Sequence, residues 1–376
     1  MALDPSTQSV GPIGVTDDES LGFDLFDVAT IPDDAIRERY ERALRRGRAM
    51  SAAMTRDFPD RRPVRMLITE EQAFNAHAGA DDLGYRLELA KPVPLFLLIL
   101  FERLLSDPRL LPWLDVEGEK VSDYQTPFVF DPAHFGVREL WSIQLTDIRS
   151  FAAGMLADLT LAFMQMHELG HVMCGHVEGY HAATGRRAMA ELSMASDDVG
   201  TAQLEREQAW EADADSVAAS LLVQYLRELV TVADEHPKAQ DVFGRGEETV
   251  EHVLSLAVVA LYALFAYLRG ARYALGRRSS HPHPFVRANY VKDMTMTVAR
   301  REWAVNLDRF AELMNERLDE MLVALGEADL SDNAVFDDTY IDAAEREGEA
   351  LMRLRRKHRK SCLAWSWFSW TNADTI

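Results

Sequence analysis

The spacing of apolar positions changes at about residue 146, from short alternating segments to long helical repeats. Before that point, residues 64–69 and 85–89 alternate apolar and polar side chains as half-buried strands do, and residues 127–130 and 137–145 do so less clearly. Beyond it, apolar side chains recur every three or four residues, which is typical of helices with one buried face. The pattern therefore predicts a small N-terminal sheet followed by a helical region, an α+β fold that is mostly α.

Four long helices are predicted in the second part of the chain. The first begins at Thr146 or Asp147, either of which can cap it, and runs into His167. The other three cover residues 201–233, 251–275 and 298–325. A stretch containing Gly and Ser, residues 175–200, is predicted to be a loop.

Two earlier segments also have helical spacing. Residues 33–54 carry six arginines, which are interpreted as a solvated helix face. Residues 94–105 are almost entirely apolar and are interpreted as a core helix.

The chain divides into four parts by composition. Residues 1–20 are polar and acidic and are expected to be a flexible leader without a secretory signal. Residues 21–145 hold the predicted sheet, and residues 146–326 form the helical part of the same domain. Residues 327–376 are expected to be an acidic linker followed by a basic and aromatic tail.

The tail combines a basic run with tryptophans. Six Lys or Arg side chains lie between residues 353 and 360, and the aromatic residues that follow are Trp365, Trp367, Phe368 and Trp370. Such a segment can lie at a membrane interface, or it can pack against its own domain or bind a partner. Both alternatives stay open.

Composition excludes several classes of protein. The 376 residues are 48% hydrophobic and 27% charged, which excludes disordered and fibrous proteins. The net charge of -21 repels phosphates, so nucleic acid is not an expected partner. Two cysteines cannot form a disulfide framework, which favours a cytoplasmic location, with peripheral membrane contact only through the tail. The apolar run at 253–268 is shorter than the roughly 20 residues that cross a bilayer and is interpreted as a core helix.

A metal-binding pattern, His167-Glu168-Leu169-Gly170-His171, lies at the end of the helix that begins at residue 146. Residues four apart share one helix face, so the two imidazoles can reach the same metal ion. Glu168 lies beside them, near the coordination position that the rings leave open. This HExxH pattern suits zinc, with Glu168 as a general base.

The third metal ligand is predicted on the helix at 201–233. Glu211 is favoured over Glu207 and Glu191 because Asp215 lies four residues after it, on the same helix face. From there Asp215 can accept a hydrogen bond from an imidazole N–H of His167 or His171, which fixes the ring tautomer.

Polar residues that follow the HExxH pattern closely are less suited to bind the metal. Zinc peptidases of the metzincin class need a His six residues after the second His, where this chain has Val177. His176 and His181 are interpreted as facing solvent, and Cys174 as a small buried helix residue.

Three motifs, HELGH, EADAD and a later His281-Pro282 followed by Arg287, resemble those of gluzincin metallopeptidases of the HtpX and CAAX-prenyl-endopeptidase type. The resemblance covers residues 146–291. It implies a zincin-like metallopeptidase domain with one catalytic Zn²⁺, whose ligands are His167, His171 and Glu211. It also implies that His281, or its neighbour His283, donates a hydrogen bond to the oxyanion, and that Arg287 holds the loop or contacts substrate.

Members of those families typically span the membrane several times, whereas this chain has no convincing span. It is therefore more similar to a soluble relative such as the phage-exclusion peptidase Lit.

The expected function is zinc-dependent endoproteolysis of a protein or peptide substrate. Zinc lowers the pKa of a coordinated water to around neutral, and Glu168 would accept its proton and pass it to the leaving amine. An edge of the small sheet would align the extended peptide. The competing class is a non-catalytic zinc-binding regulatory or partner-binding protein, and a third is a membrane-associated processing peptidase.

Overall fold

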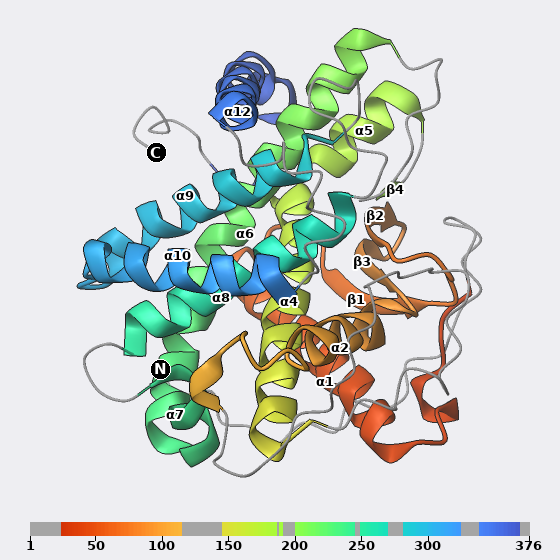
Figure 1. Cartoon of the computed structure of the whole chain (residues 1–376). Helices are drawn as coiled ribbons and strands as arrows, with labels where there is room; N and C mark the ends of the chain where they lie inside the picture. The colour runs from red at the N-terminus through yellow and green to blue at the C-terminus, as the bar shows by residue number, and fades with distance from the viewer. Residues whose placement is uncertain are drawn as a thin grey trace.

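The computed structural model describes residues 24–114, 145–185, 188–190, 200–244, 249–269, 281–324 and 338–368. Within these ranges the chain is mostly helical with one small sheet, so the expected α+β class with a majority of helix is confirmed. The sheet lies on one flank of the helical body (Figure 1).

The helices are α1 (Asp34–Asp57), α2 (Val93–Leu104), α4 (Asp147–Met173), α5 (His176–Thr184), α6 (Thr201–Glu235), α7 (Pro237–Phe243), α8 (Thr249–Arg269), α9 (Pro284–Glu302), α10 (Leu307–Ala324) and α12 (Asp338–His358). The strands are β1 (Val64–Thr69), β2 (Ala76–Asp81), β3 (Gly84–Ala90) and β4 (Ala188–Ala190). Single 3-10 turns lie at Val28–Thr30, Pro112–Leu114 and Arg359–Cys362.

The sheet has the strand order β1-β3-β2-β4. The two strands predicted at 64–69 and 85–89 are confirmed as β1 and β3, which pair in parallel. β2 pairs antiparallel with β3 on one side and with β4 on the other. Residues 127–130 and 137–144 lie outside the described ranges, and Leu145 belongs to no strand.

The sequence pattern did not predict β2 and β4, because of the side chains that they carry. β2 reads AHAGAD and β4 reads AMA, so neither carries the β-branched or aromatic side chains that mark strands. Residues 175–200, predicted as a loop, contain both β4 and the helix α5. That prediction was wrong for these two elements.

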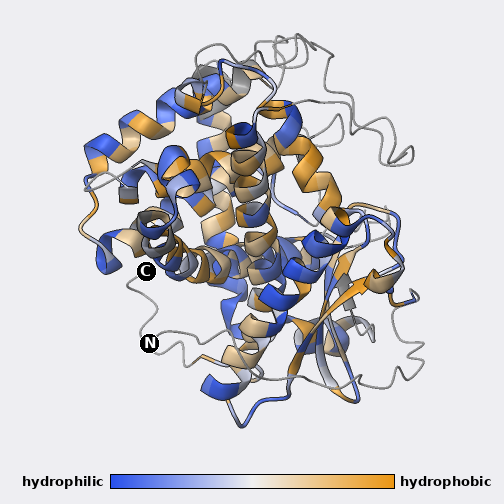
Figure 2. Ribbon diagram, turned by 90° about the horizontal axis from the view of Figure 1, so that it is seen from below, coloured by the Kyte–Doolittle hydropathy of each residue, from blue (hydrophilic) through white to orange (hydrophobic). Residues whose placement is uncertain are grey.

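α4 is the central helix of the fold. It begins at Thr146, whose side chain accepts a hydrogen bond from the Arg149 amide at 3.4 Å, as predicted. Every residue from Leu159 to Met173 is buried, because α2, α6, α8 and the sheet surround this end of the helix. Most other helices show alternating orange and blue stripes, as helices with one buried face do (Figure 2).

The predicted helix at 298–325 is two helices instead of one. α9 ends at Glu302, and the backbone of the next residue, Trp303, is extended (φ -132°, ψ 154°). Asn306 then starts α10, because its side-chain oxygen accepts a hydrogen bond from the Arg309 amide at 3.2 Å. Its own amide donates to Glu251 on α8 at 2.6 Å. Periodicity alone does not detect such a cap.

The expected acidic linker is helical where the structure describes it. Residues 338–349 form the first half of α12, which packs against α6 and α9. Ala344 and Leu351 are buried there against Val286 and Ala212. The apolar positions are few but share one helix face, and that face is enough to dock α12.

The tail folds back onto the end of α4. Trp367 is buried, its amide donates to the Met173 carbonyl at 2.8 Å, and its ring centroid lies 5.2 Å from that of Phe58. Intramolecular packing, one of the two alternatives for the tail, is therefore observed at this residue. Trp365 is 36% exposed, and Trp370 lies outside the described residues.

The arginine-rich α1 is less solvated than expected. Asp158 on α4 receives ion pairs from Arg39, Arg42 and Arg46 at 3.2–3.6 Å. Arg39 is only 3% exposed and also donates to the Pro94 carbonyl at 2.7 Å. These arginines attach α1 to the central helix.

α8 is the one helix among the described residues that is long and apolar enough to cross a membrane. The qualifying window is Thr249–Ala266, and 78% of it is buried inside the fold, as in a core helix. α8 starts two residues before the predicted 251, and residues 270–275 of that prediction lie outside the described ranges.

Candidate metal centre

The two sequence motifs meet where α4 crosses α6. A Cβ atom placed on Gly170 would lie 2.8 Å from the Ala214 carbonyl oxygen and 2.9 Å from its Cα. Only glycine allows this approach, because both contacts are backbone atoms that cannot rotate away. Gly170 of HELGH and Ala214 of EADAD thus bring the polar side chains on either side of them together.

Two imidazoles and one carboxylate converge at this crossing. The Nε2 atoms of His167 and His171 are 3.0 Å apart. Glu211 places Oε2 3.4 Å from His167 Nε2 and Oε1 3.3 Å from His171 Nε2. All three residues are buried, and among the described residues they form the group of His, Cys, Asp and Glu side chains that could hold a metal ion.

Asp215 lies beside one of the two imidazoles, that of His167. Its Oδ1 lies 2.8 Å from His167 Nδ1, on the side of the ring away from Glu211. Arg287 donates two hydrogen bonds to the same carboxylate, from Nε to Oδ2 at 3.0 Å and from Nη2 to Oδ1 at 2.9 Å. Its Nη1 also lies 3.4 Å from Glu211. Arg287 therefore pairs with acidic partners of the site, the first of its two expected roles.

The two candidate histidines after α8 have different positions. His281 Nε2 lies 3.6 Å from Glu211 Oε1, so this ring borders the metal-binding group. His283 instead caps α9, where its Nδ1 accepts a hydrogen bond from the Phe285 amide at 3.2 Å. The structure brings His281 to the site and gives His283 a helix-capping role.

The charge state of Glu211 suits metal binding. Burial alone would raise the pKa of this carboxyl, but the neighbouring His281, His167 and His171 hold its pKa well below the usual range. Burial raises the pKa of Glu207, which accepts a hydrogen bond from Gln203 at 2.9 Å and is not part of the group. Glu191, the other rival, lies outside the described residues.

His176 is a residue beside the metal-binding group that sequence reasoning missed. It was expected to face solvent, but it is 1% exposed, and its Nδ1 lies 3.0 Å from His171 Nδ1. The available signal was Gly175, which ends the helix and takes the left-handed conformation (φ 76°) that turns the chain back. His181 is exposed as expected, and Cys174 is a buried helix-end residue.

Glu168 is buried at the same crossing, immediately after the first histidine of the group and 2% exposed. A carboxyl beside two imidazoles and a third ligand can serve as a general base, provided that a metal ion and a water occupy the site.

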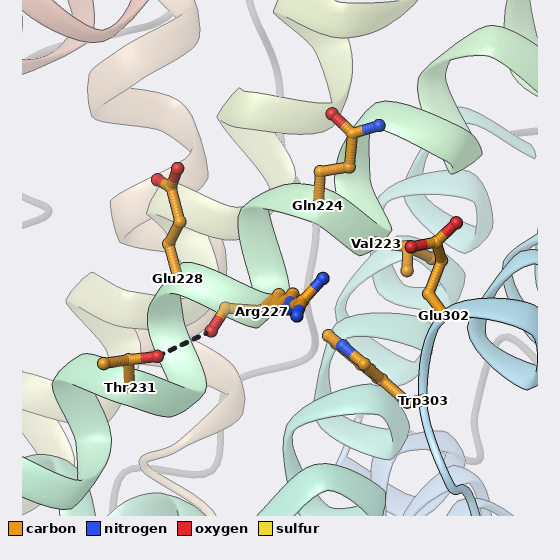
Figure 3. Close-up of a pocket in the computed structure, with 7 residues that line it drawn as sticks. All are labelled: Val223, Gln224, Arg227, Glu228, Thr231, Glu302 and Trp303. Carbon is orange, nitrogen blue, oxygen red and sulfur yellow. Dashed lines mark hydrogen bonds between the residues drawn. The ribbon is translucent and has the colours of Figure 1, made fainter. Parts of the chain in front are cut away.

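A separate cavity of about 460 Å³ lies along the far half of α6 (Figure 3). Its walls come from α6 and from the end of α9, including Arg227, Glu302 and Trp303. The nearest wall residue on α6, Val223, is twelve positions beyond Glu211, which is about 18 Å along a helix. The metal-binding group therefore does not open into this cavity.

No protein-family model, no curated protein and no solved structure matches this chain. The chemistry of the site is therefore inferred from its residues and their geometry.

Proposed function

We propose that this protein is a zinc-dependent endopeptidase of the gluzincin type, with a zincin-like catalytic domain and a protein substrate. The observation that carries the proposal is the convergence of the HExxH histidines with Glu211, beside a buried Glu168. Two independent sequence motifs contribute to this group from two different helices, α4 and α6.

The donor spacing supports zinc. Zinc binds imidazole nitrogen and carboxylate oxygen at about 2.0–2.2 Å, so neighbouring donors around a tetrahedral ion lie about 3.3–3.5 Å apart. Each imidazole Nε2 lies 3.3 or 3.4 Å from one of the two Glu211 oxygens, within this range, and the two Nε2 atoms are slightly closer to each other, at 3.0 Å. Two neutral imidazoles and one carboxylate are also the donor set of known catalytic zinc sites.

The protein residues have separate tasks in this proposal. Asp215 accepts a hydrogen bond from the Nδ1–H group of His167, which leaves Nε2 free to bind a metal ion. When bound, zinc makes a coordinated water acidic enough to be used near neutral pH. Glu168 accepts the proton from the attacking water and returns it to the leaving amine, and His281 donates a hydrogen bond to the oxyanion.

β4 is the sheet edge that we propose for the substrate. The outer edge of β1 is already used, because the Phe26 amide donates to the Ile68 carbonyl at 2.9 Å and Leu25 bridges to Thr69. β4 lies at the other end of the strand order and contacts α5, which directly follows the HExxH helix. An extended peptide could pair with this edge through main-chain hydrogen bonds.

The test compares Glu168→Gln with Glu207→Gln, a control on a partly exposed carboxyl outside the metal group. Glu168→Gln should retain one zinc per chain and hydrolyse an unfolded protein about 10²–10⁴-fold more slowly than the wild type. Glu207→Gln should retain both zinc and activity. Hydrolysis by Glu168→Gln at the wild-type rate would refute the assignment.

A non-catalytic zinc module is the second candidate function. It is favoured by one observation, that His167, His171, Glu168 and Glu211 are each no more than 4% exposed, so that the group has little contact with solvent. The presence of Glu168 opposes it, since a structural site has no use for a general base. Wild-type protein that binds zinc but hydrolyses no unfolded protein would favour this alternative.

A further inference from the structure

A chain of buried polar groups leads from the metal-binding group to the C-terminal helix. His171 Nδ1 lies 3.0 Å from His176 Nδ1, and His176 Nε2 lies 4.0 Å from Asp213 Oδ2. Asp213 Oδ1 in turn accepts a hydrogen bond from Arg355 Nε at 2.5 Å. His171, His176, Asp213 and Arg355 are all less than 7% exposed.

The proton positions along this chain follow from the metal site. His171 presents Nε2 to His167 and Glu211, so a metal ion would take that nitrogen and the ring proton must lie on Nδ1. This N–H donates to His176 Nδ1, which assigns the His176 proton to Nε2. The Asp213 carboxylate, whose Oδ2 lies 4.0 Å from His176 Nε2, favours the same tautomer through its charge.

Arg355 forms a buried ion pair with Asp213, the last member of the chain. Arg355 also donates to the Tyr290 hydroxyl on α9 at 2.7 Å, so its position is fixed by two partners. It lies on α12, 142 residues after Asp213.

The ring of His176 is held in place by packing as well. It stacks on Trp210 with centroids 5.3 Å apart and planes 16° apart. A Cβ on Gly175 would lie 2.7 Å from the Trp365 carbonyl carbon, and one on Gly179 would lie 2.6 Å from Cys362 Sγ. The tail therefore packs closely against α5 at Gly175, directly before His176, and at Gly179, three residues after it.

We propose that His176 is a positioning residue for the metal ligand His171, and that Arg355 on the C-terminal helix supports it through Asp213. α12 is then part of the metal centre although it supplies no ligand. This inference rests on the proposed metal site, but it does not require that the site be catalytic.

The test measures the affinity for Zn²⁺ by competition with a chromophoric chelator. His176→Leu removes the acceptor for the His171 N–H and should weaken zinc binding about 10–100-fold. His176→Gln offers an amide oxygen in its place and should restore most of the affinity. His181→Leu, an exposed histidine on the same helix, is the matched control and should bind zinc as the wild type does.

A second pair of variants tests the far end of the chain. Arg355→Met should weaken zinc binding several-fold, whereas Arg353→Met, whose side chain is 61% exposed on the same helix, should not. The absorption spectrum of the Co²⁺-substituted protein should shift in His176→Leu and Arg355→Met, since the visible bands report ligand geometry. Circular dichroism of each apoprotein checks that the fold is retained. If His176→Leu does not fold, the zinc affinity and Co²⁺ spectrum of Arg355→Met test the proposal.

The outcomes separate the two proposals. Zinc affinities and Co²⁺ spectra of His176→Leu and Arg355→Met equal to those of the wild type would overturn the positioning role and leave the peptidase proposal standing. Weakened binding in a protein that hydrolyses no substrate would support the positioning role and overturn the peptidase. Wild-type protein that binds no zinc would overturn both.

Discussion

Replacing Gly170 by alanine tests the close crossing of α4 and α6 on which the site depends. The added Cβ would lie 2.8 Å from the Ala214 carbonyl oxygen, whereas ordinary contact begins at 3.4 Å, so the helices must separate by about 0.6 Å. Neither atom belongs to a side chain that can turn aside. The separation would also move Glu211 away from the two imidazoles.

Gly154→Ala on the same helix is the matched control, because nothing lies within 4 Å of the Cβ that it would add. Alanine favours a helix interior over glycine by about 1 kcal/mol, and this gain is common to both variants. Their difference therefore isolates the overpacking cost, which is about 1–3 kcal/mol. Gly154→Ala should be more stable than the wild type, and Gly170→Ala less stable than Gly154→Ala by that amount.

Urea unfolding of the zinc-free proteins, followed by circular dichroism, measures the difference in unfolding free energy. Zinc titration of the same samples should show weaker binding in Gly170→Ala alone. Equal stability and equal zinc affinity of the two variants would refute the close-crossing account.

Two further predictions concern stability away from the metal. Arg149 is fully buried and donates to carbonyls of the 105–111 turn, including Leu105 and Leu110 at 3.0 Å. Arg149→Met should lower the unfolding free energy, measured in urea, by about 1.5–3 kcal/mol. The control is Arg109→Met, which changes an exposed arginine, and equal small effects of the two variants would contradict the prediction. Burial raises the pKa of the Cys362 thiol from 9.0 to about 11. The neutral thiol therefore contributes its full stability below pH 9, and this contribution is lost as the pH rises towards 11. Between pH 9 and 11 the unfolding free energy of Cys362→Ala should fall less than that of the wild type. Parallel plots of unfolding free energy against pH for the two proteins would contradict this prediction.

The residues of the candidate metal-binding group could be predicted because their signals are local. His167 and His171 lie one helical turn apart on the same helix face. Glu211 is favoured over the other candidate glutamates because only Glu211 has an aspartate, Asp215, four residues after it. Helical periodicity also placed α4 and α6 within a few residues of their observed ends.

Features that depend on distant contacts were not predictable in the same way. The burial of His176 results from the turn at Gly175 and from the tail that packs on it. Arg355 is one of six basic residues in the run at 353–360, and only the packing of α12 places it against Asp213. β4 is three residues long and exists through its pairing with β2, which no local pattern encodes.

The measurement that tests the central claim most directly compares newly formed protein termini in cells expressing the wild type and Glu168→Gln at equal levels. A zinc endopeptidase whose general base is Glu168 predicts a set of new termini that is present with the wild type and absent with the variant. These termini would also identify the substrate and the residues on either side of the cleaved bond. The same termini in both samples, or none in either, would contradict the claim.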